Sequence, residues 1–595
     1  MTTGLHLFTK SQWSFYQDDL LFTAEVPTTG LLDFMFRPIA SHWAPGTLGL
    51  IWVVTTLDPM SYAWATATTT VLAAGTVLVW GLLLREIFGE RLHLLAGVVL
   101  LAVTPGLLMD SLWWSRGLGV YTTLLIMGLC LWFLAKMLVR GPSVLDAVGL
   151  AVSYAFGLFM WEKSLVVTIP LLFLCLLLGP SDLRGAVRRC VRLLWPVTVL
   201  TIVYIPLFLY AVRDAPEVHP DEPVQRSVGA AFSFLAHGIV DLALPTMVGG
   251  PFTEPTGVSG YFPDASGSLA LGLFSATVLL VILALRFRRR GWLAIAMVVT
   301  HALIAWGLVF FTNRFEFVGD LAIRSPHYSA DLVPVMVLAA LFLVTRTVLD
   351  EEVPVRTPVR PETLSWLRRG LTGYLALVCV VVPVTTGRVW DDLKPESPKP
   401  YFDTLFAEAR DLGTVDVYDS RVPKEIVNPA LLDAGSKISA VLRPLDLPLR
   451  YNQPAEQYAM VDESGHFRTA AVVGGHTNAG PGPDGECGYA VNAGEVTRIP
   501  LTGDLFALEW AMEITYFTGS DARIAVRTDD DRVELDLPTN EAGDVGRRQL
   551  VIASEVTSLE IEGLSGENTV CVAAVRIGLI EPTDEVPDQL KDDED

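Results

Sequence analysis

The chain has 595 residues, a mean hydropathy of +0.44 and a formal net charge of −22. Its apolar residues form runs long enough to cross a bilayer, which excludes an ordinary soluble protein. From Val389 onward there are 40 Asp and Glu against 17 Lys and Arg, whereas the preceding part has 25 against 26. This distribution excludes nucleic acid as a partner, because phosphates need a basic surface. It predicts a nearly neutral membrane part joined to an acidic soluble domain.

Residues 1–59 are predicted to form an external loop that ends in a short juxtamembrane or re-entrant helix. The apolar run 44–57 is too short to span a bilayer, and counting it as a span would invert every later loop. Before it lie adjacent carboxylates, Asp18 and Asp19, followed by Arg37 and His42. A carboxylate at the membrane surface could take the proton from an acceptor hydroxyl. The alternative is that both acids are solvated or cap a helix.

Ten runs in the predicted membrane domain, residues 60–387, are long enough to span the hydrocarbon core. They are 60–84, 92–109, 119–138, 145–161, 164–180, 193–211, 268–286, 291–311, 330–349 and 370–387. Alternate connections differ in charge: one set carries 17 Lys and Arg, including Arg286 and Arg288 to Arg290, and the other carries 6. The positive-inside rule makes the first set cytoplasmic. Residues 1–59, the loops around Trp113, Trp161, Pro251 and Arg324, and the tail are then external, and residues 230–248 are expected to lie at the interface.

The external loops carry cations at the same predicted membrane face. The candidate donor-phosphate ligands are Arg116, Lys163, Arg324, His327 and Tyr328. Arg suits bidentate phosphate contact, and a phosphate leaving group needs cationic stabilisation as its charge develops. Arg37, His42 and Glu162 are candidates for acceptor or loop contacts. The alternative for each is interfacial anchoring, with Trp and Arg at headgroup depth.

The sequence has no His, Cys and Asp spacing typical of a metal site, and no P-loop, Rossmann glycine motif or nucleophile elbow that could function. We therefore predict no cofactor, with a divalent cation as the alternative. Bound ATP is not expected, which favours a preactivated lipid donor.

The tail is predicted to hold an α/β neck (388–450), a β-sandwich (451–580) and an acidic disordered end (581–595). Short alternating runs, such as 508–517 and 570–580, are separated by Gly, Pro, Asn and Asp clusters, which is typical of a sandwich. Cys487 and Cys571 are the only cysteines of the tail. A lone pair in an exported domain predicts one disulfide, with two unpaired buried thiols as the alternative.

These features resemble the GT-C superfamily of polytopic glycosyltransferases. The resemblance rests on the Asp18-Asp19 pair, Arg37-Pro38, His42-Trp43-Ala44-Pro45 before a juxtamembrane helix, and the segment SPHYSADLVP after Arg324. It implies a polyprenyl-phosphate sugar donor, a glycan, glycolipid or glycoprotein acceptor outside the membrane, and an Asp base, Asp18 in first place. The external β domain resembles the carbohydrate-binding modules of some actinobacterial members, and a role in cell-wall biogenesis at the bacterial plasma membrane is implied.

One feature departs from the family pattern. GT-C proteins normally have a transmembrane helix before the Asp-containing loop, whereas about a dozen residues without an apolar run precede it here; we expect that the start codon was assigned too late. Two other functions stay open. A flippase or exporter of lipid-linked glycan would show mid-membrane charges and inverted repeats, neither of which is clear. A non-catalytic glycan-binding assembly protein would keep both acids as caps.

Overall fold

The computed structural model describes residues 2–39, 42–179, 182–215, 223–250, 277, 290–311, 313–349, 361–429, 432–540 and 544–590. The predicted span 268–286 and the loop around Pro251 lie outside these residues. The chain divides into two compact units, Met1–Ser397 and Pro398–Asp595. The first unit is helical and the second is mainly β.

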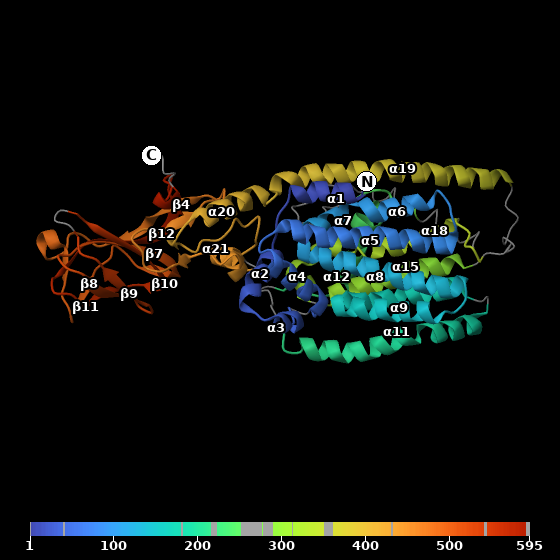
Figure 1. Cartoon of the computed structure of the whole chain (residues 1–595), viewed down its shortest axis with the longest axis horizontal. Coiled ribbons are helices and arrows are strands. Elements are labelled where there is room, and N and C mark those ends of the chain that lie inside the picture. The colour runs from blue at the N-terminus through green and yellow to red at the C-terminus, as the bar shows by residue number, and fades with distance from the viewer. Residues whose placement is uncertain are drawn as a thin grey trace. The chain divides into compact units, whose positions relative to one another are not determined.

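Within the described residues, six segments of the first unit are long and apolar enough to cross a membrane. They are Tyr62–Phe88 (α5), Leu94–Leu112 (α6, Leu94–Val103, and α7, Pro105–Leu112), Trp114–Val139 (α8), Arg184–Val212 in α11 (Leu183–Val212), Val228–Met247 and Gly291–Phe310 (α15). Three further predicted spans contain shorter helices, Val144–Met160 (α9), Thr168–Leu178 (α10) and Leu332–Val344 (α18). The run 370–387 lies inside Pro361–Leu393 (α19). The chain is therefore a multi-helix membrane protein (Figure 1).

Side-chain packing explains how the central helices approach one another. A Cβ on Gly128 of α8 would lie 2.9 Å from Trp80 Nε1 of α5. The same indole nitrogen donates to Leu124 O of α8 at 2.9 Å. Small residues let membrane helices pack closely, and a buried indole N–H needs an acceptor. Between α6 and α7, Pro105 occupies the first helical position of α7, where its missing N–H costs nothing, so the predicted span 92–109 is divided.

The segment that we expect at the interface, 230–248, forms one continuous run of three helical pieces. These are Val228–His237 (α12), a short π-helical segment Gly238–Ala243 (η3), which we call the π-turn, and Leu244–Met247 (α13). By length and composition the run could span a membrane, although it carries the buried Asp241. Short π-helical segments within α-helices are frequent at functional sites. An ionisable residue within an apolar helix is likewise a candidate for a functional residue.

The N-terminal segment forms short helices, the first of which lies alongside α5 while the others lie at one end of the helical unit (Figure 1). They are Thr2–Ser11 (α1), Asp18–Glu25 (α2), Val26–Thr28 (η1), Leu31–Phe36 (α3) and Pro45–Leu57 (α4). The predicted juxtamembrane helix corresponds to α4, which begins with Pro at its first position. Its first turn packs on the end of α9, because a Cβ on Gly46 would lie 2.4 Å from Met160 Sδ and Thr47 Oγ1 donates to Met160 O at 2.7 Å.

The second unit contains an eight-stranded sheet, whose main path is β10-β7-β12-β4-β3-β1-β2 with β5 paired to β12, and a four-stranded sheet in the order β6-β11-β8-β9. The long strands are Phe467–Thr477 (β4), Leu505–Phe517 (β7), Gly546–Val556 (β10) and Val570–Pro582 (β12). The shorter ones are Val415–Val417 (β1), Leu449–Tyr451 (β2), Ala459–Val461 (β3), Tyr489–Val491 (β5), Val496–Ile499 (β6), Ala522–Arg527 (β8), Arg532–Leu537 (β9) and Leu559–Ser565 (β11). One hydrophobic core draws on strands of both sheets, including Met512, Ile524 and Ile561.

The segment predicted as an α/β neck contains Lys399–Asp411 (α20), β1, Ile438–Leu442 (α21) and β2. Strand β1 runs parallel to both β2 and β3, and β3 pairs with β4, so this segment extends the large sheet. At the other end of the unit, residues 581–590 include the end of β12 and a short 3-10 helix, Asp588–Leu590 (η9). The remaining acidic residues, 591–595, lie outside the described part of the chain.

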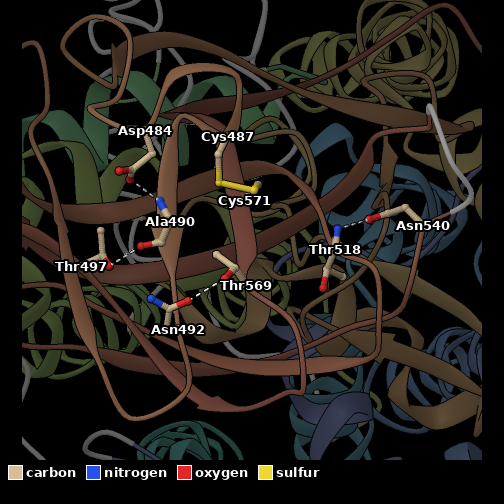
Figure 2. The surroundings of a disulfide bond; sticks show 9 residues. All are labelled: Asp484, Cys487, Ala490, Asn492, Thr497, Thr518, Asn540, Thr569 and Cys571. Atoms are coloured by element: carbon tan, nitrogen blue, oxygen red, sulfur yellow. Dashed lines mark hydrogen bonds between the residues drawn. A yellow bond between two sulfur atoms is a disulfide. The ribbon is translucent and has the colours of Figure 1, made fainter.

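The predicted disulfide between Cys487 and Cys571 is confirmed. It links the turn before β5 to β12, with 4.7 Å between the two Cα atoms (Figure 2). Around it, Thr497 Oγ1 donates to Ala490 O and Thr569 Oγ1 donates to Asn492 Oδ1. The bond and these contacts fix β5 against β12.

Candidate functional site

Asp19 caps the N-terminus of α8. Its Oδ1 accepts from Ser115 N at 2.8 Å, and its Oδ2 accepts from Trp114 N and Tyr16 N, both at 3.2 Å. The side chain is fully buried, and burial raises the pKa of Asp19 to about 7 despite these donors. The first N–H groups of a helix have no partner within the helix, so a carboxylate that accepts from them ties the N-terminal loop to α8.

Asp18 lies in the first turn of α2 and is half-buried. The residue before it, Gln17, has a positive φ of 49°, a conformation that costs energy for a residue with a Cβ. Such strain is concentrated at functional sites and persists only where the surroundings enforce it. Asp18 is thus held next to the capping Asp19, and through it near the start of α8.

Arg116, one residue after Ser115, belongs to a buried polar chain. Its Nε donates to Asp110 Oδ1 at 2.7 Å, and its Nη2 lies 3.5 Å from Ser325 Oγ. Ser325 Oγ in turn lies 2.9 Å from His327 Nδ1. The side chains of Arg116 and Asp110 are 7% and 0% exposed, and Arg116 Nη1 and Asp110 Oδ2 have no hydrogen-bond partner among the described residues. A buried guanidinium and carboxylate with unused positions can accept a polar ligand.

Lys163 joins the same chain from η2 (Glu162–Val167). Its Nζ donates to His327 O at 3.0 Å and forms an ion pair with Asp331 Oδ1 at 2.7 Å. Asp331 Oδ2 lies 2.9 Å from His301 Nε2 of α15, and both side chains are almost fully buried. The polar chain therefore runs from Asp110 through Arg116, Ser325, His327, Lys163 and Asp331 to His301; we call it the Arg116–Lys163 network.

Arg324 lies in a second polar group, beside the first. Its Nη2 is 2.8 Å from His237 Nδ1, and its Nε is 3.5 Å from Asp241 Oδ2. His237 Nδ1 is also 2.7 Å from Asp241 Oδ2, across one turn at the junction of α12 and η3. The π-turn places both side chains toward α17 (Leu321–Arg324). Arg324 is thus already paired with a carboxylate, as are Arg116 and Lys163.

The remaining predicted site residues, Arg37, His42, Glu162 and Tyr328, each contact another side chain. His42 Nδ1 contacts Glu162 Oε1, Arg37 pairs with Glu25, and the Arg37 guanidinium stands 4.4 Å from the centre of the Phe34 ring. Tyr328 packs directly against His327, with 3.6 Å between the ring centres. The structure therefore brings Arg116, Lys163, His327 and Tyr328 together. Arg37 contributes to the fold of the N-terminal loop.

A small, mostly apolar cavity adjoins Pro326 and Ser329, which flank the His327–Tyr328 pair. It is lined by Thr104, which precedes α7, and by residues of α7, of η3 and α13, and of α18, including Leu242, Thr246 and Met336. Among the described residues, no three His, Cys, Asp or Glu side chains form a group that could hold a metal ion. The donors of the site are guanidinium, ammonium, hydroxyl and imidazole groups, which suit an anionic ligand.

Sequence reasoning missed Asp331, His301 and His237. One signal could have found them: each is an ionisable residue in or beside an apolar helix, where such residues are rare and usually functional. His301 stands in the middle of α15 and is fully buried, so its position alone marked it as a candidate.

No known family model matches the sequence, and no curated protein matches it. Among solved structures, the chain is similar to ArnT from Cupriavidus metallidurans in the apo state, with 13% identity and a TM-score of 0.42 over 76% of this chain and 84% of that one. The same protein bound to undecaprenyl phosphate gives 12% identity and 0.41 over 78% and 92%. The arabinofuranosyltransferase AftD from Mycobacteria gives 10% identity and 0.34 over 98% of this chain and 59% of that one. These similarities concern the fold.

Proposed function

We propose that this protein is a membrane glycosyltransferase that transfers a sugar from a polyprenyl-phosphate donor to a cell-envelope acceptor outside the membrane. The observation that carries the proposal is the Arg116–Lys163 network, in which two largely buried cations, a serine hydroxyl and an imidazole converge from three separate segments. Such a group of donors stabilises a phosphate as negative charge develops on it. The acceptor is a glycan, glycolipid or glycoprotein.

Arg116 and Lys163 are the proposed phosphate ligands. Their partners Asp110 and Asp331 fix the positions of the two cations before the substrate arrives, so little reorganisation is needed during the reaction. Arg116 Nη1, which has no hydrogen-bond partner in the described part of the chain, provides a donor that the ion pair does not use. Arg324 is bound more fully, by Asp241 and His237, and we assign it a supporting role.

Asp18 is the proposed general base. Asp19 is fully buried and both its oxygens accept backbone N–H groups, so Asp18 is the acid of the pair that can meet an acceptor. In the proposed reaction the acceptor hydroxyl oxygen forms a bond to the anomeric carbon while the bond from that carbon to the phosphate oxygen breaks. The hydroxyl proton passes to Asp18, and the polyprenyl phosphate leaves with its charge on Arg116 and Lys163.

The location of these residues suits a lipid-linked donor. The network lies where α7 and α9 end and where α8 and α18 begin, which are helix ends that the charge distribution of the loops assigns to the outside. A donor there keeps its prenyl chain in the bilayer while its phosphate reaches the cations. The C-terminal β domain, which we interpret as an external sandwich, would hold the acceptor glycan and raise its local concentration.

Transfer of radiolabelled sugar tests the proposal. Membranes containing equal amounts of each protein are supplied with synthetic undecaprenyl-phosphate pentoses and hexoses, a carrier of the kind bound in the ArnT structure. The variants are Asp18→Asn, Asp19→Asn and Lys163→Met, with Asp33→Asn, an exposed acid of α3, as the matched control. We expect wild-type turnover, a loss of at least about a hundredfold in Asp18→Asn, the low end of a general base's contribution, and full activity in Asp33→Asn.

Two results would contradict the proposal. Equal turnover in the wild type and Asp18→Asn would remove Asp18 from the mechanism. An absence of transfer with every donor would favour a transporter or a non-catalytic glycan-binding protein.

A further inference from the structure

A third polar group, His42 with Glu162, lies beside Trp161. His42 precedes α4, and Glu162 is the first residue of η2, yet His42 Nδ1 contacts Glu162 Oε1. The close packing of Gly46 and Thr47 against the end of α9 brings the two together. The indole of Trp161 lies close both to this pair and to the proposed phosphate ligand, with its centre 6.5 Å from that of the His42 ring and 5.6 Å from Lys163 Nζ.

Two polar atoms of this group are buried and lack a hydrogen-bond partner among the described residues. They are Glu162 Oε2 and the hydroxyl of Tyr204, which comes from α11. The Glu162 side chain is 14% exposed and Tyr204 is 6% exposed. The Tyr204 ring lies 6.0 Å from that of Trp43, the residue after His42. Buried polar atoms are nearly always hydrogen-bonded, so an unpartnered acceptor and an unpartnered hydroxyl here indicate a ligand or water that supplies both bonds.

The charges around the group select the chemistry of that ligand. The Glu162 carboxylate disfavours an anion. Lys163, whose Nζ lies 5.6 Å from the centre of the Trp161 ring, disfavours a cation. A neutral hydroxyl group suits either atom, because it can donate to Glu162 Oε2 or accept from the Tyr204 hydroxyl. The aromatic rings of Trp43 and Trp161 supply the apolar walls that often accompany such polar contacts in ligand sites.

We propose that His42, Glu162, Tyr204 and Trp161 form a subsite for the hydroxyl groups of a neutral sugar unit. Resting on the proposed function, the subsite would hold the sugar of the acceptor or of the donor beside the phosphate ligands. Trp161 is the wall that the two sites share. Its position depends on α8, because a Cβ on Gly119 would lie 2.7 Å from Trp161 Cε3.

Saturation-transfer NMR on the full chain in nanodiscs tests the subsite without requiring turnover. The probes are the methyl glycosides of arabinofuranose, mannose and glucose, with cyclohexylmethanol as a hydroxyl-poor control. Tyr204→Phe removes only the unpartnered hydroxyl, Glu162→Leu removes the carboxylate, and Gly119→Ala displaces Trp161. The matched control is Glu408→Gln, because Glu408 forms a similar pair with His466 in the second unit, at 2.6 Å.

We expect saturation transfer to at least one glycoside in the wild type and in Glu408→Gln. The signal should fall at least fivefold in Tyr204→Phe, Glu162→Leu and Gly119→Ala. Wild-type signals that are absent for every glycoside, or undiminished in Tyr204→Phe and Glu162→Leu, would overturn the proposal. Tyr204→Phe must melt at the wild-type temperature, since it breaks no hydrogen bond to any residue that the structure describes.

Transfer kinetics then separate this proposal from the proposed function. Binding of a glycoside at the subsite without any sugar transfer by the wild type would leave the subsite standing and remove the glycosyltransferase function. If transfer occurs, Tyr204→Phe should raise the KM for the acceptor or for the donor severalfold with kcat kept, and the substrate affected identifies which sugar binds. If Tyr204→Phe leaves the KM for the acceptor and the KM for the donor unchanged, the subsite proposal is overturned, while the proposed glycosyltransferase function is unaffected.

Discussion

The two adjacent acids illustrate how identical side chains differ through their surroundings. Asp19 uses both oxygens for backbone N–H groups of the loop and of α8, whereas Asp18 lies in the first turn of α2 and is half-buried. The sequence placed both acids at the membrane face, and it also predicted a helix cap as the alternative role. It could not assign the cap to Asp19, because the capped helix begins at Trp114, far along the chain. Only the packing of the N-terminal loop on α8 decides that.

Asp19 should make the stability of the protein depend on pH. Burial raises the folded-state pKa of Asp19 from an ordinary 3.8 to about 7. Between these values the folded state binds more protons than the unfolded state, so stability falls as the pH rises through this window and is constant above it. The loss between pH 5 and pH 7 is on the order of 2 kcal/mol.

Thermal unfolding of the solubilised protein at several pH values measures this effect. Asp19→Asn cannot ionise, so its melting temperature should change less between pH 5 and pH 7 than that of the wild type. Asp33→Asn should keep the wild-type dependence. Parallel curves for the wild type and Asp19→Asn would show that Asp19 is charged in the folded state throughout this range.

At the scale of elements, the sequence predicted most apolar helices but not how they are divided. The span predicted over 92–109 is two helices separated at Pro105, and the segment 230–248 contains a π-turn. Hydropathy measures the apolar character of a window and carries no information about a change in helix type. The π-turn matters for the site because it presents His237 and Asp241 together to Arg324.

Gly238, the first residue of the π-turn, should be intolerant of a side chain. An added Cβ would lie 2.7 Å from Ile323 Cγ1 of α17 and 3.0 Å from Trp306 Cζ3 of α15. Gly238→Ala should therefore move α17 and Arg324, and lower stability by about 1–3 kcal/mol through overpacking. Sugar transfer and melting temperature are both expected to decrease.

Gly229→Ala in the same helical run is the matched control. A Cβ there would meet only Ser227 Oγ, at 3.8 Å, so the substitution should be neutral or slightly stabilising. Equal behaviour of the two variants would mean that α12 and α17 do not depend on this contact.

The disulfide between Cys487 and Cys571 should contribute to the stability of the second unit. Cys487 and Cys571 are separated by 84 residues, and closing a loop of that length stabilises a domain by about 4–5 kcal/mol in the chain-entropy view. Replacing both with Ser should lower the melting temperature of the second unit and expose residues 398–595 to limited proteolysis. Cys379→Ser, which removes an exposed free thiol, should change neither. If the double variant keeps the wild-type melting temperature and protease resistance, the pairing of β5, β7 and β12 is sufficient to stabilise the second unit without the disulfide.

At the scale of the whole molecule, composition alone located the two environments. The change in charge near Val389 lies close to the division of the structure between Ser397 and Pro398. Alternation of apolar and polar residues predicted a β domain after the membrane part, and the structure shows one. Composition could not predict that the parallel strands β1 and β2 extend the large sheet, because that pairing joins segments whose own patterns are short.

The orientation of the chain in the membrane is the last prediction. The basic ends of the helices, at Arg85, Lys136 and Arg140, lie opposite the ends that hold the Arg116–Lys163 network, so the positive-inside rule places the network outside. A single cysteine at Ser464, exposed in the second unit, should react with a membrane-impermeant maleimide in intact cells. A cysteine at Arg140 should react only after permeabilisation. The reverse pattern would put Asp18 and the network in the cytoplasm, where the same residues would have to meet a donor on the inner leaflet.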